Sequence, residues 1–208
     1  ELRPGLQKID GVLDGPVVLS GAEYVLIRKG IAKSSRNIKH GGVPKVLIVG
    51  GGSDPFGYVK AVTEVIGSLG LKLEVHVFTQ DSIPTGSEVN FFIHPIGSEL
   101  DLIAGDFDVV LTTASTSSLE FIAREIPTGV VSAVDNQENY YEELGRLGYA
   151  QQIGKKKSDG EWWFDRPQMV ELLGNQRKRE ALKKLVTGLI DFKGAERVID
   201  FLVSFDAK

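Results

Sequence analysis

The sequence contains no cysteine, so disulfide bonds and thiolate metal sites are excluded. Its three histidines, His40, His76 and His94, are far apart in the chain and give no sign of a metal cluster, so we expect neither a metal nor another cofactor. No apolar run approaches the roughly 18 residues that a membrane-spanning helix needs, and no secretory signal peptide is visible. These absences predict a cytoplasmic protein with no membrane partner.

A large excess of one charge is also lacking. The 208 residues carry a formal net charge of -4, which gives no general attraction to nucleic acid. A chain of this length forms one principal domain, but it is too short for two complete nucleotide-binding domains. Methionine occurs once, at Met169, and the chain begins with Glu1. We therefore interpret it as the C-terminal part of a longer protein.

The order of the segments predicts the fold class. Short apolar runs that fit buried strands alternate with segments of helical periodicity, and short turns join them. Such alternation predicts an α/β fold, with a Rossmann-like parallel sheet and helices on both faces. The expected strands are residues 45–50, 73–78, 89–93, 108–111 and 129–132.

The two ends of the chain differ from this alternation. Residues 1–42 are expected to form a linker and inter-domain segment, and residues 43–208 the domain with its C-terminal helices. The stretch from Lys155 to Phe164 fits a surface hairpin or loop. Two amphipathic helices then close the chain, and the second carries an apolar stripe between Ala195 and Val203.

A hydroxyl-rich turn follows the expected strand at 108–111. A helix is expected to start in this turn, and a helix N-terminus offers unpaired N–H groups and about half a positive charge, which suit a phosphate. Glu120 falls in the first helical turn, where its carboxylate can accept hydrogen bonds from both hydroxyls of a ribose. A nucleotide site is one interpretation of this pattern. The hydroxyl residues are Ser115, Thr116, Ser117 and Ser118.

The same residues fit a second interpretation. Ser117-x-x-Glu120 is a capping box, in which side chains satisfy the N–H groups of the helix and no ligand is needed. Asp135-x-x-Glu138, at the next expected helix start, has the same ambiguity. Spacing alone does not decide between the two interpretations, although two polar helix starts in succession favour a site.

A glycine turn follows the first expected strand and contains Gly51, Gly52 and Ser53. Because ligands of parallel sheets bind at the carboxyl ends of the strands, we expect this turn and those at Ser115 and Asp135 on one rim. The G-x-G-x-x-G spacing of a nicotinamide-dependent dehydrogenase is incomplete, since Phe56 follows Pro55. A P-loop is excluded, because the chain has no Gly-Lys-Ser/Thr.

Several short segments, taken together, resemble a known family. Their order and spacing resemble the C-terminal half of the UDP-2,4-diacetamido-2,4,6-trideoxy-β-L-altropyranose hydrolase family of pseudaminic acid biosynthesis, and spore-coat polysaccharide biosynthesis proteins are similar. Residues 21–28 look like the segment that joins the two domains of that family. The matching segments are residues 51–55, 117–120, 126–127, 135–137, 147–148 and 193–197.

The resemblance implies a glycosyltransferase-B-like protein of two domains, whose C-terminal domain holds the UDP part of a UDP-sugar. On that pattern Glu120 binds the ribose, Ser53 and residues 116–118 bind the diphosphate, and Asn136 and Gln137 bind the sugar. Gly51, Gly52 and Ser115 complete the substrate-binding set. The partner of this chain would be the missing N-terminal domain.

The catalytic histidine of that family lies in the N-terminal domain, so this chain would be catalytically incomplete alone. The resemblance implies half of a UDP-sugar hydrolase or glycosyltransferase-like enzyme of nonulosonic acid or surface polysaccharide biosynthesis. The closing helix would pack on the missing domain, and without that domain its apolar stripe would join two copies into a homodimer.

One departure from the family motivates an alternative. Thr113, Ala114 and Ser115 stand where the family usually has glycines, and their Cβ atoms obstruct the close approach of a backbone to a pyrophosphate. In this alternative the chain is a degenerate, non-catalytic module fused to a sugar-activating nucleotidyltransferase.

Overall fold

A computed structural model describes residues 17–28, 30–38, 40–51, 54–80, 82–83, 88–95 and 100–206. Within these ranges seven strands form one sheet in the order β3-β2-β1-β4-β5-β6-β7, and only the last pair is antiparallel. The predicted α/β fold with a parallel sheet is confirmed. The strands are β1 (Lys45–Val49), β2 (Leu73–Phe78), β3 (Val89–His94), β4 (Val109–Thr113), β5 (Thr128–Ser132), β6 (Gln151–Lys156) and β7 (Trp162–Phe164).

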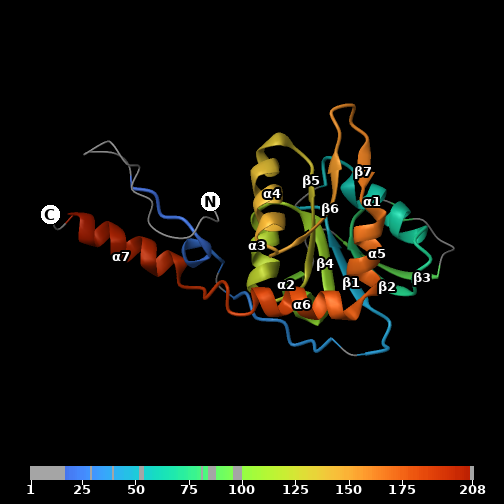
Figure 1. Ribbon diagram of the computed structural model, residues 1–208, viewed down its shortest axis with the longest axis horizontal. Helices are drawn as coiled ribbons and strands as arrows, with labels where there is room; N and C mark the ends of the chain where they lie inside the picture. Colours follow the sequence, from blue (N-terminus) through green and yellow to red (C-terminus); the bar gives the residue numbers. More distant parts are fainter. Residues whose placement is uncertain are drawn as a thin grey trace.

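Helices cover both faces of the sheet (Figure 1). Helices α1 (Tyr58–Gly67) and α5 (Arg166–Gly174) pack on one face. Helices α2 (Leu100–Ile103), α3 (Thr116–Ala123) and α4 (Glu138–Arg146) pack on the other, together with the short 3₁₀ helix η2 (Ala104–Asp106). Helix α6 (Gln176–Val186) contributes to both cores, through Leu182 on one side and Val186 on the other.

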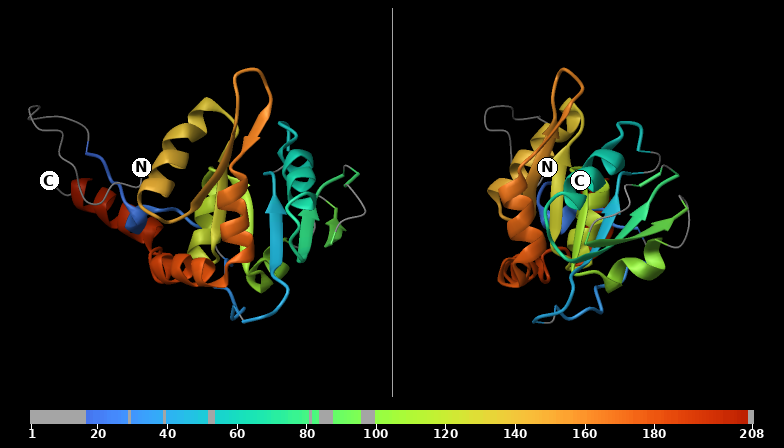
Figure 2. Two further views of the ribbon diagram at one scale, coloured as in Figure 1. Left: turned by 45° about the vertical axis from the view of Figure 1, so that its right-hand side comes forward. Right: turned by 90° about the vertical axis from the view of Figure 1, so that its right-hand side faces the viewer.

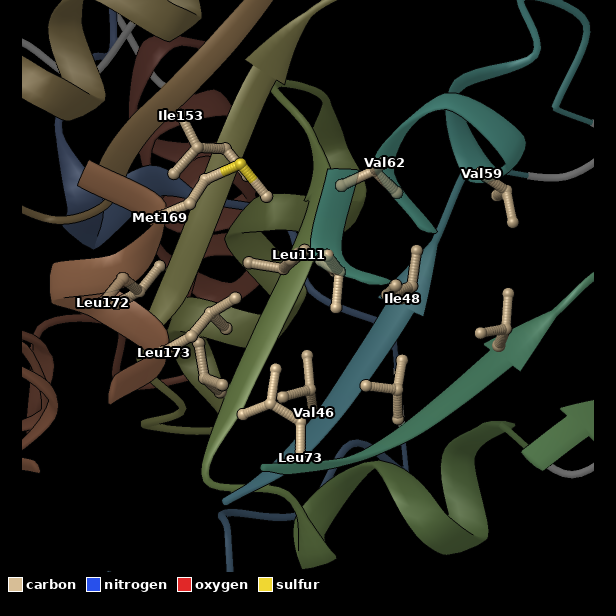
Figure 3. Packing of buried hydrophobic residues seen from close by; sticks show 14 of the residues in the cluster. Val46, Ile48, Val59, Val62, Leu73, Leu111, Ile153, Met169, Leu172 and Leu173 are labelled. Carbon is tan, nitrogen blue, oxygen red and sulfur yellow. The ribbon is translucent and has the colours of Figure 1, made fainter. Parts of the chain in front are cut away.

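The central strands are apolar on both sides because both sides are buried. In β1, Val46 and Ile48 point toward α1, whereas Leu47 and Val49 point toward the opposite face, and none of them is more than 6% exposed. Figure 3 shows the first of these cores, which also contains Leu111 from β4. Burying each such side chain stabilises the fold by about 1.5–3 kcal/mol, which explains the continuous aliphatic runs.

Two elements were not predicted from the sequence. Strand β6 contains only one aliphatic residue, Ile153, and lacks the pattern of a buried strand. Helix α5 does have a helical signal, because Met169, Leu172 and Leu173 share one buried face and the carboxylate of Asp165 accepts a hydrogen bond from the N–H of Gln168. The two helices that were expected to close the chain are both present within the described residues, and α5 is an additional helix that precedes them.

The last helix, α7 (Gly194–Asp206), extends away from the sheet (Figures 1 and 2). It packs against the 3₁₀ helix η1 (Ala22–Tyr24), and Arg197 donates a hydrogen bond to the backbone oxygen of Glu23 at 2.8 Å. Its residues Ile199, Leu202 and Val203 are 58–67% exposed. No helix in the described ranges is long and apolar enough to cross a membrane.

The segment after η1 is fastened to the domain. Ser34 donates its backbone N–H to the oxygen of Arg124, and the side chain of Lys183 donates to the oxygen of Arg36 at 3.0 Å. Residues 1–16 lie outside the described residues. The role of residues 1–42 as an inter-domain segment therefore stays a prediction.

Candidate functional site

The strand order creates a switch point between β1 and β4. From β1 the chain continues to β2 on one side, and from β4 it continues to β5 on the other. Ligands of open parallel sheets bind at such a point, outside the carboxyl ends of the strands. Because β1 pairs with β4 and β4 pairs with β5, the turns that contain Gly51, Ser115 and Asn136 lie along one rim, as expected. Gly52 and Ser53 lie outside the described residues.

The turn after β1 is folded tightly against the start of α1. The carboxylate of Asp54 accepts hydrogen bonds from the N–H groups of Tyr58 at 3.0 Å and Val59 at 2.9 Å. A Cβ at Gly50 would lie 2.9 Å from Asp54 and 2.8 Å from Val59, so only glycine fits there without a shift. Gly51 is exposed and has a φ of 88°, which glycine adopts readily. Asp54 therefore satisfies the helix start from within the protein.

The turn after β4 leaves donors unused. Helix α3 begins at Thr116, and neither Ser115 nor another side chain caps it. Within the described residues, the backbone N–H groups of Thr116 and Ser117 donate to no hydrogen-bond acceptor. Ser118 is fully buried, and its N–H and hydroxyl both donate to the oxygen of Ser115. Two backbone donors and the hydroxyls of Thr116 and Ser117 therefore remain for a ligand.

The capping box that was the second interpretation of Ser117 and Glu120 does not form. Ser117 is the second residue of α3 instead of its cap, and the Glu120 carboxylate is held by Arg28. The Nε of Arg28 contacts Oε1 at 2.6 Å, and Nη2 contacts Oε2 at 2.8 Å. One carboxylate that was expected to bind ribose is thus already engaged by a guanidinium 92 residues away in the chain.

Arg28 belongs to a group of four charges beside α3. Its Nη1 also contacts Asp101 at 3.2 Å, and Asp101 in turn contacts the buried guanidinium of Arg124. The hydrogen bonds with Glu120 raise the pKa of Arg28 above its usual value, so the guanidinium stays charged at all ordinary pH. Sequence reasoning missed Arg28, although it lies in the segment that resembles the family's domain connection. The contact ties that segment to α3.

The turn after β5 is held from within by Gln137. Its side-chain oxygen accepts a hydrogen bond from the N–H of Ala133 at 3.0 Å. The cap that was the alternative interpretation of Asp135 and Glu138 does not form, because no side chain caps either the 3₁₀ helix η3 (Asp135–Gln137) or α4. Asn136 is exposed at the rim. Of the two residues expected to bind the sugar, Asn136 is the more accessible.

A cavity of about 530 Å³ adjoins this turn. One wall comes from Phe56 in the turn after β1, another from residues 132–135 and Glu138, and a third from the hairpin of β6 and β7, the type of element predicted for this stretch. Trp162 of the hairpin packs against Tyr58 and Phe164, and its Nε1 donates to the oxygen of Phe56 at 3.1 Å. The aromatic packing thus fixes the hairpin beside the rim.

The histidines lie away from the switch point. Nδ1 of His76 contacts Nε2 of His94 at 2.8 Å, and Nε2 of His76 contacts Glu74 at 2.9 Å, all on β2 and β3. Burial lowers the pKa of His76 below its usual value. Within the part of the chain that the structure describes, no three acidic or histidine side chains gather to hold a metal ion.

The strand order, the covered faces and the open rim define the class of this fold. It is the order of nucleotide-binding α/β domains, and the chain has the Rossmann-like architecture of the C-terminal domain in glycosyltransferase-B folds. No protein-family model matches the sequence, and no curated protein matches it either.

Solved structures with this fold are similar to the chain over most of its length. MurG of Acinetobacter baumannii is 14% identical with a TM-score of 0.60, over 80% of this chain and 51% of MurG. The spinosyn forosaminyltransferase SpnP is 15% identical with a TM-score of 0.55, over 91% of this chain and 52% of SpnP. A putative UDP-N-acetylglucosamine 2-epimerase of Listeria monocytogenes is 14% identical with a TM-score of 0.52, over 84% of this chain and 50% of the epimerase chain.

The chain spans about half the length of these structures. At such low sequence identity, the similarity to these structures shows only that the fold is shared. The similarity does not single out the hydrolase family that the motifs resemble. The binding roles of Gly51, Ser115, Thr116, Glu120 and Asn136 remain predictions.

Proposed function

We propose that this chain is the UDP-sugar-binding half of a UDP-sugar hydrolase or glycosyltransferase-like enzyme of nonulosonic acid or surface polysaccharide biosynthesis. The observation that carries the proposal is the pair of unpartnered N–H groups of Thr116 and Ser117 at the β1/β4 switch point. A helix N-terminus with free donors suits a diphosphate. Among the similar structures, that of Os79 from O. sativa is a complex with UDP, and its TM-score is 0.54.

In this proposal the ligand lies across the ends of β1, β4 and β5. Thr116 and Ser117 bind the diphosphate, and the Glu120 carboxylate accepts hydrogen bonds from the ribose hydroxyls. Asn136 binds the sugar, while Gln137 holds the turn that presents Asn136. The buried Ser118 stabilises the turn after β4. Gly51 would border the diphosphate site from the β1 side, and binding by Gly52 and Ser53 stays a prediction from the sequence.

The chemistry would be completed by the other half of the protein, which would make the enzyme a two-domain, cytoplasmic one. A water oxygen forms a bond to the anomeric carbon while the bond from that carbon to the phosphate oxygen breaks. UDP leaves with the electron pair, and a base in the other half takes the proton of the water. The free N–H groups at the start of α3 would stabilise the charge that develops on the leaving phosphate.

Calorimetric titration of the folded chain with UDP tests the proposal. We expect measurable affinity that falls when Thr116 is replaced by proline, because proline removes one of the two free N–H groups together with the Thr116 hydroxyl but fits the first position of a helix. A folded chain that binds neither UDP nor a UDP-sugar would contradict the proposal.

A second candidate is a non-catalytic module fused to a sugar-activating nucleotidyltransferase. Two observations favour it: the side chains of Thr113, Ala114 and Ser115 at the diphosphate turn, and the Arg28 guanidinium on Glu120. The residues encoded before Glu1 distinguish the two. A glycine-rich motif with a histidine supports the hydrolase, whereas a nucleotidyltransferase domain supports the module.

A further inference from the structure

Lysines dominate the hairpin wall of the cavity beside the β5 turn. Lys155 is already paired, because its ammonium contacts Glu138 at 2.9 Å and Glu142 at 2.8 Å. Lys156 and Lys157 have no ion-pair partner among the residues that the structure describes. Three lysines and only two carboxylates, Asp135 and Glu138, line the cavity. Because Lys155 pairs with both Glu138 and Glu142, the two ammonium groups of this wall that form no ion pair within the described residues are those of Lys156 and Lys157.

Lys156 is held in place at the rim. Its ammonium lies 5.2 Å from the ring centroid of Phe56, and the backbone oxygen of Phe56 accepts a hydrogen bond from Nε1 of Trp162 in the same hairpin. A cation over an aromatic ring is attracted to it, and a side chain that is already ordered loses less entropy when it binds an anion. A hydroxyl donor is also present, because Ser158 lines the same cavity, whereas the hydroxyl of Ser132 donates to the backbone oxygen of Val134.

The size of the cavity limits what it holds. About 530 Å³ is the volume of a small-molecule pocket and is larger than a lone phosphate or carboxylate requires. A neutral sugar would fill the space but would leave the ammonium groups of Lys156 and Lys157 without a counter-charge. A sugar that carries an acid group meets both conditions.

We propose that the cavity receives the sugar of an acidic nucleotide sugar, and that Lys156 and Lys157 bind its acid group. This inference rests on the proposed function, because the Asn136 turn that would hold the sugar adjoins the cavity. It adds the substrate class: a sugar nucleotide with a carboxylate on the sugar ring, instead of a neutral one.

Three commercially available probes test the inference by calorimetry: UDP, UDP-glucose and UDP-glucuronate. The last two differ only in the oxidation of one carbon, from a hydroxymethyl group to a carboxylate. We expect UDP-glucuronate to bind about fivefold or more tightly than UDP-glucose at low salt. The preference should shrink as the salt concentration rises, because the lysines are partly exposed.

The double variant Lys156→Gln/Lys157→Gln should lose this preference and keep the affinities for UDP and UDP-glucose. Lys72→Gln/Lys184→Gln is the matched control, because it removes two exposed lysines that lie away from the cavity, and it should keep the preference. Thermal unfolding of both variants verifies that they are folded.

Equal affinity of the wild-type chain for the two sugars would overturn the inference, and so would a preference that survives in the Lys156/Lys157 variant. A loss of affinity for all three probes in that variant would assign the lysines to the diphosphate and also overturn it. Absence of UDP binding by the folded wild-type chain is a different result. It refutes the proposed function itself, and the inference with it.

Discussion

The contact between Arg28 and Glu120 gives a prediction whose sign is unexpected. Both oxygens of the Glu120 carboxylate face the Nε and Nη2 of Arg28. Two neighbouring ribose hydroxyls would bind the same end of that carboxylate, so the ribose and the guanidinium compete for it. Replacing Arg28 with alanine therefore removes a competitor, and we expect tighter binding of UDP.

The magnitude follows from the exposure of the pair. The side chain of Arg28 is 58% exposed and that of Glu120 is 21% exposed, so solvent screens much of their attraction. Such a pair contributes about 0.5–1 kcal/mol, which corresponds to about a twofold to fivefold gain in affinity for Arg28→Ala. Glu120→Ala should instead weaken binding by roughly 10-fold to 100-fold, because it removes charge-assisted hydrogen bonds worth about 1.5–3 kcal/mol.

Calorimetric titration with UDP measures both variants against the wild-type chain. Arg146→Ala serves as the control, because Arg146 also forms a bidentate, exposed pair with a glutamate, Glu143, but within α4. It should leave UDP affinity unchanged. Urea unfolding is recorded in parallel, since Arg28 also ties its segment to α3.

Two results would refute this reasoning. Weaker UDP binding by a folded Arg28→Ala chain would mean that Arg28 positions Glu120 for the ribose instead of blocking it. Unchanged affinity in Glu120→Ala would mean that this carboxylate does not contact the nucleotide.

Three further predictions concern stability and assembly. Burial lowers the pKa of His76 in the folded chain, so below the ordinary histidine pKa of about 6.5 the unfolded chain binds more protons than the folded one. Stability to urea should therefore fall as the pH drops from 7 toward about 5, and His76→Phe should reduce this pH dependence. Gly154→Ala should cost about 1–3 kcal/mol in urea unfolding, because its Cβ would overlap backbone across the hairpin, whereas Gly174→Ala should be tolerated, since its nearest neighbour atom is 3.4 Å away. Light scattering should show a homodimer that Ile199→Glu/Leu202→Glu converts to a monomer; a monomeric wild-type chain would refute this role of α7.

Much of the fold could be predicted from local patterns. The aliphatic runs of β1 and β4 indicate strands covered on both faces, and the helical periodicity of α1 indicates one buried face. Helix α5 has an equally clear pattern in Met169, Leu172 and Leu173, so local sequence is enough to indicate this helix as well. Strand β6 is different: its polar sequence becomes a strand because the edge of β5 is available for pairing, which no local pattern encodes.

The sequence by itself determined which residue types stand at the ends of the strands: glycines after β1, hydroxyls after β4 and amides after β5. Only the tertiary structure decided what those side chains contact. It placed Arg28 on Glu120 and turned the Gln137 oxygen toward the backbone of Ala133. It also brought the lysines of the hairpin beside the β5 turn. The physical reason is that hydrogen bonds and ion pairs act over a few ångströms, so partners distant in the chain become defined only when the sheet brings them together.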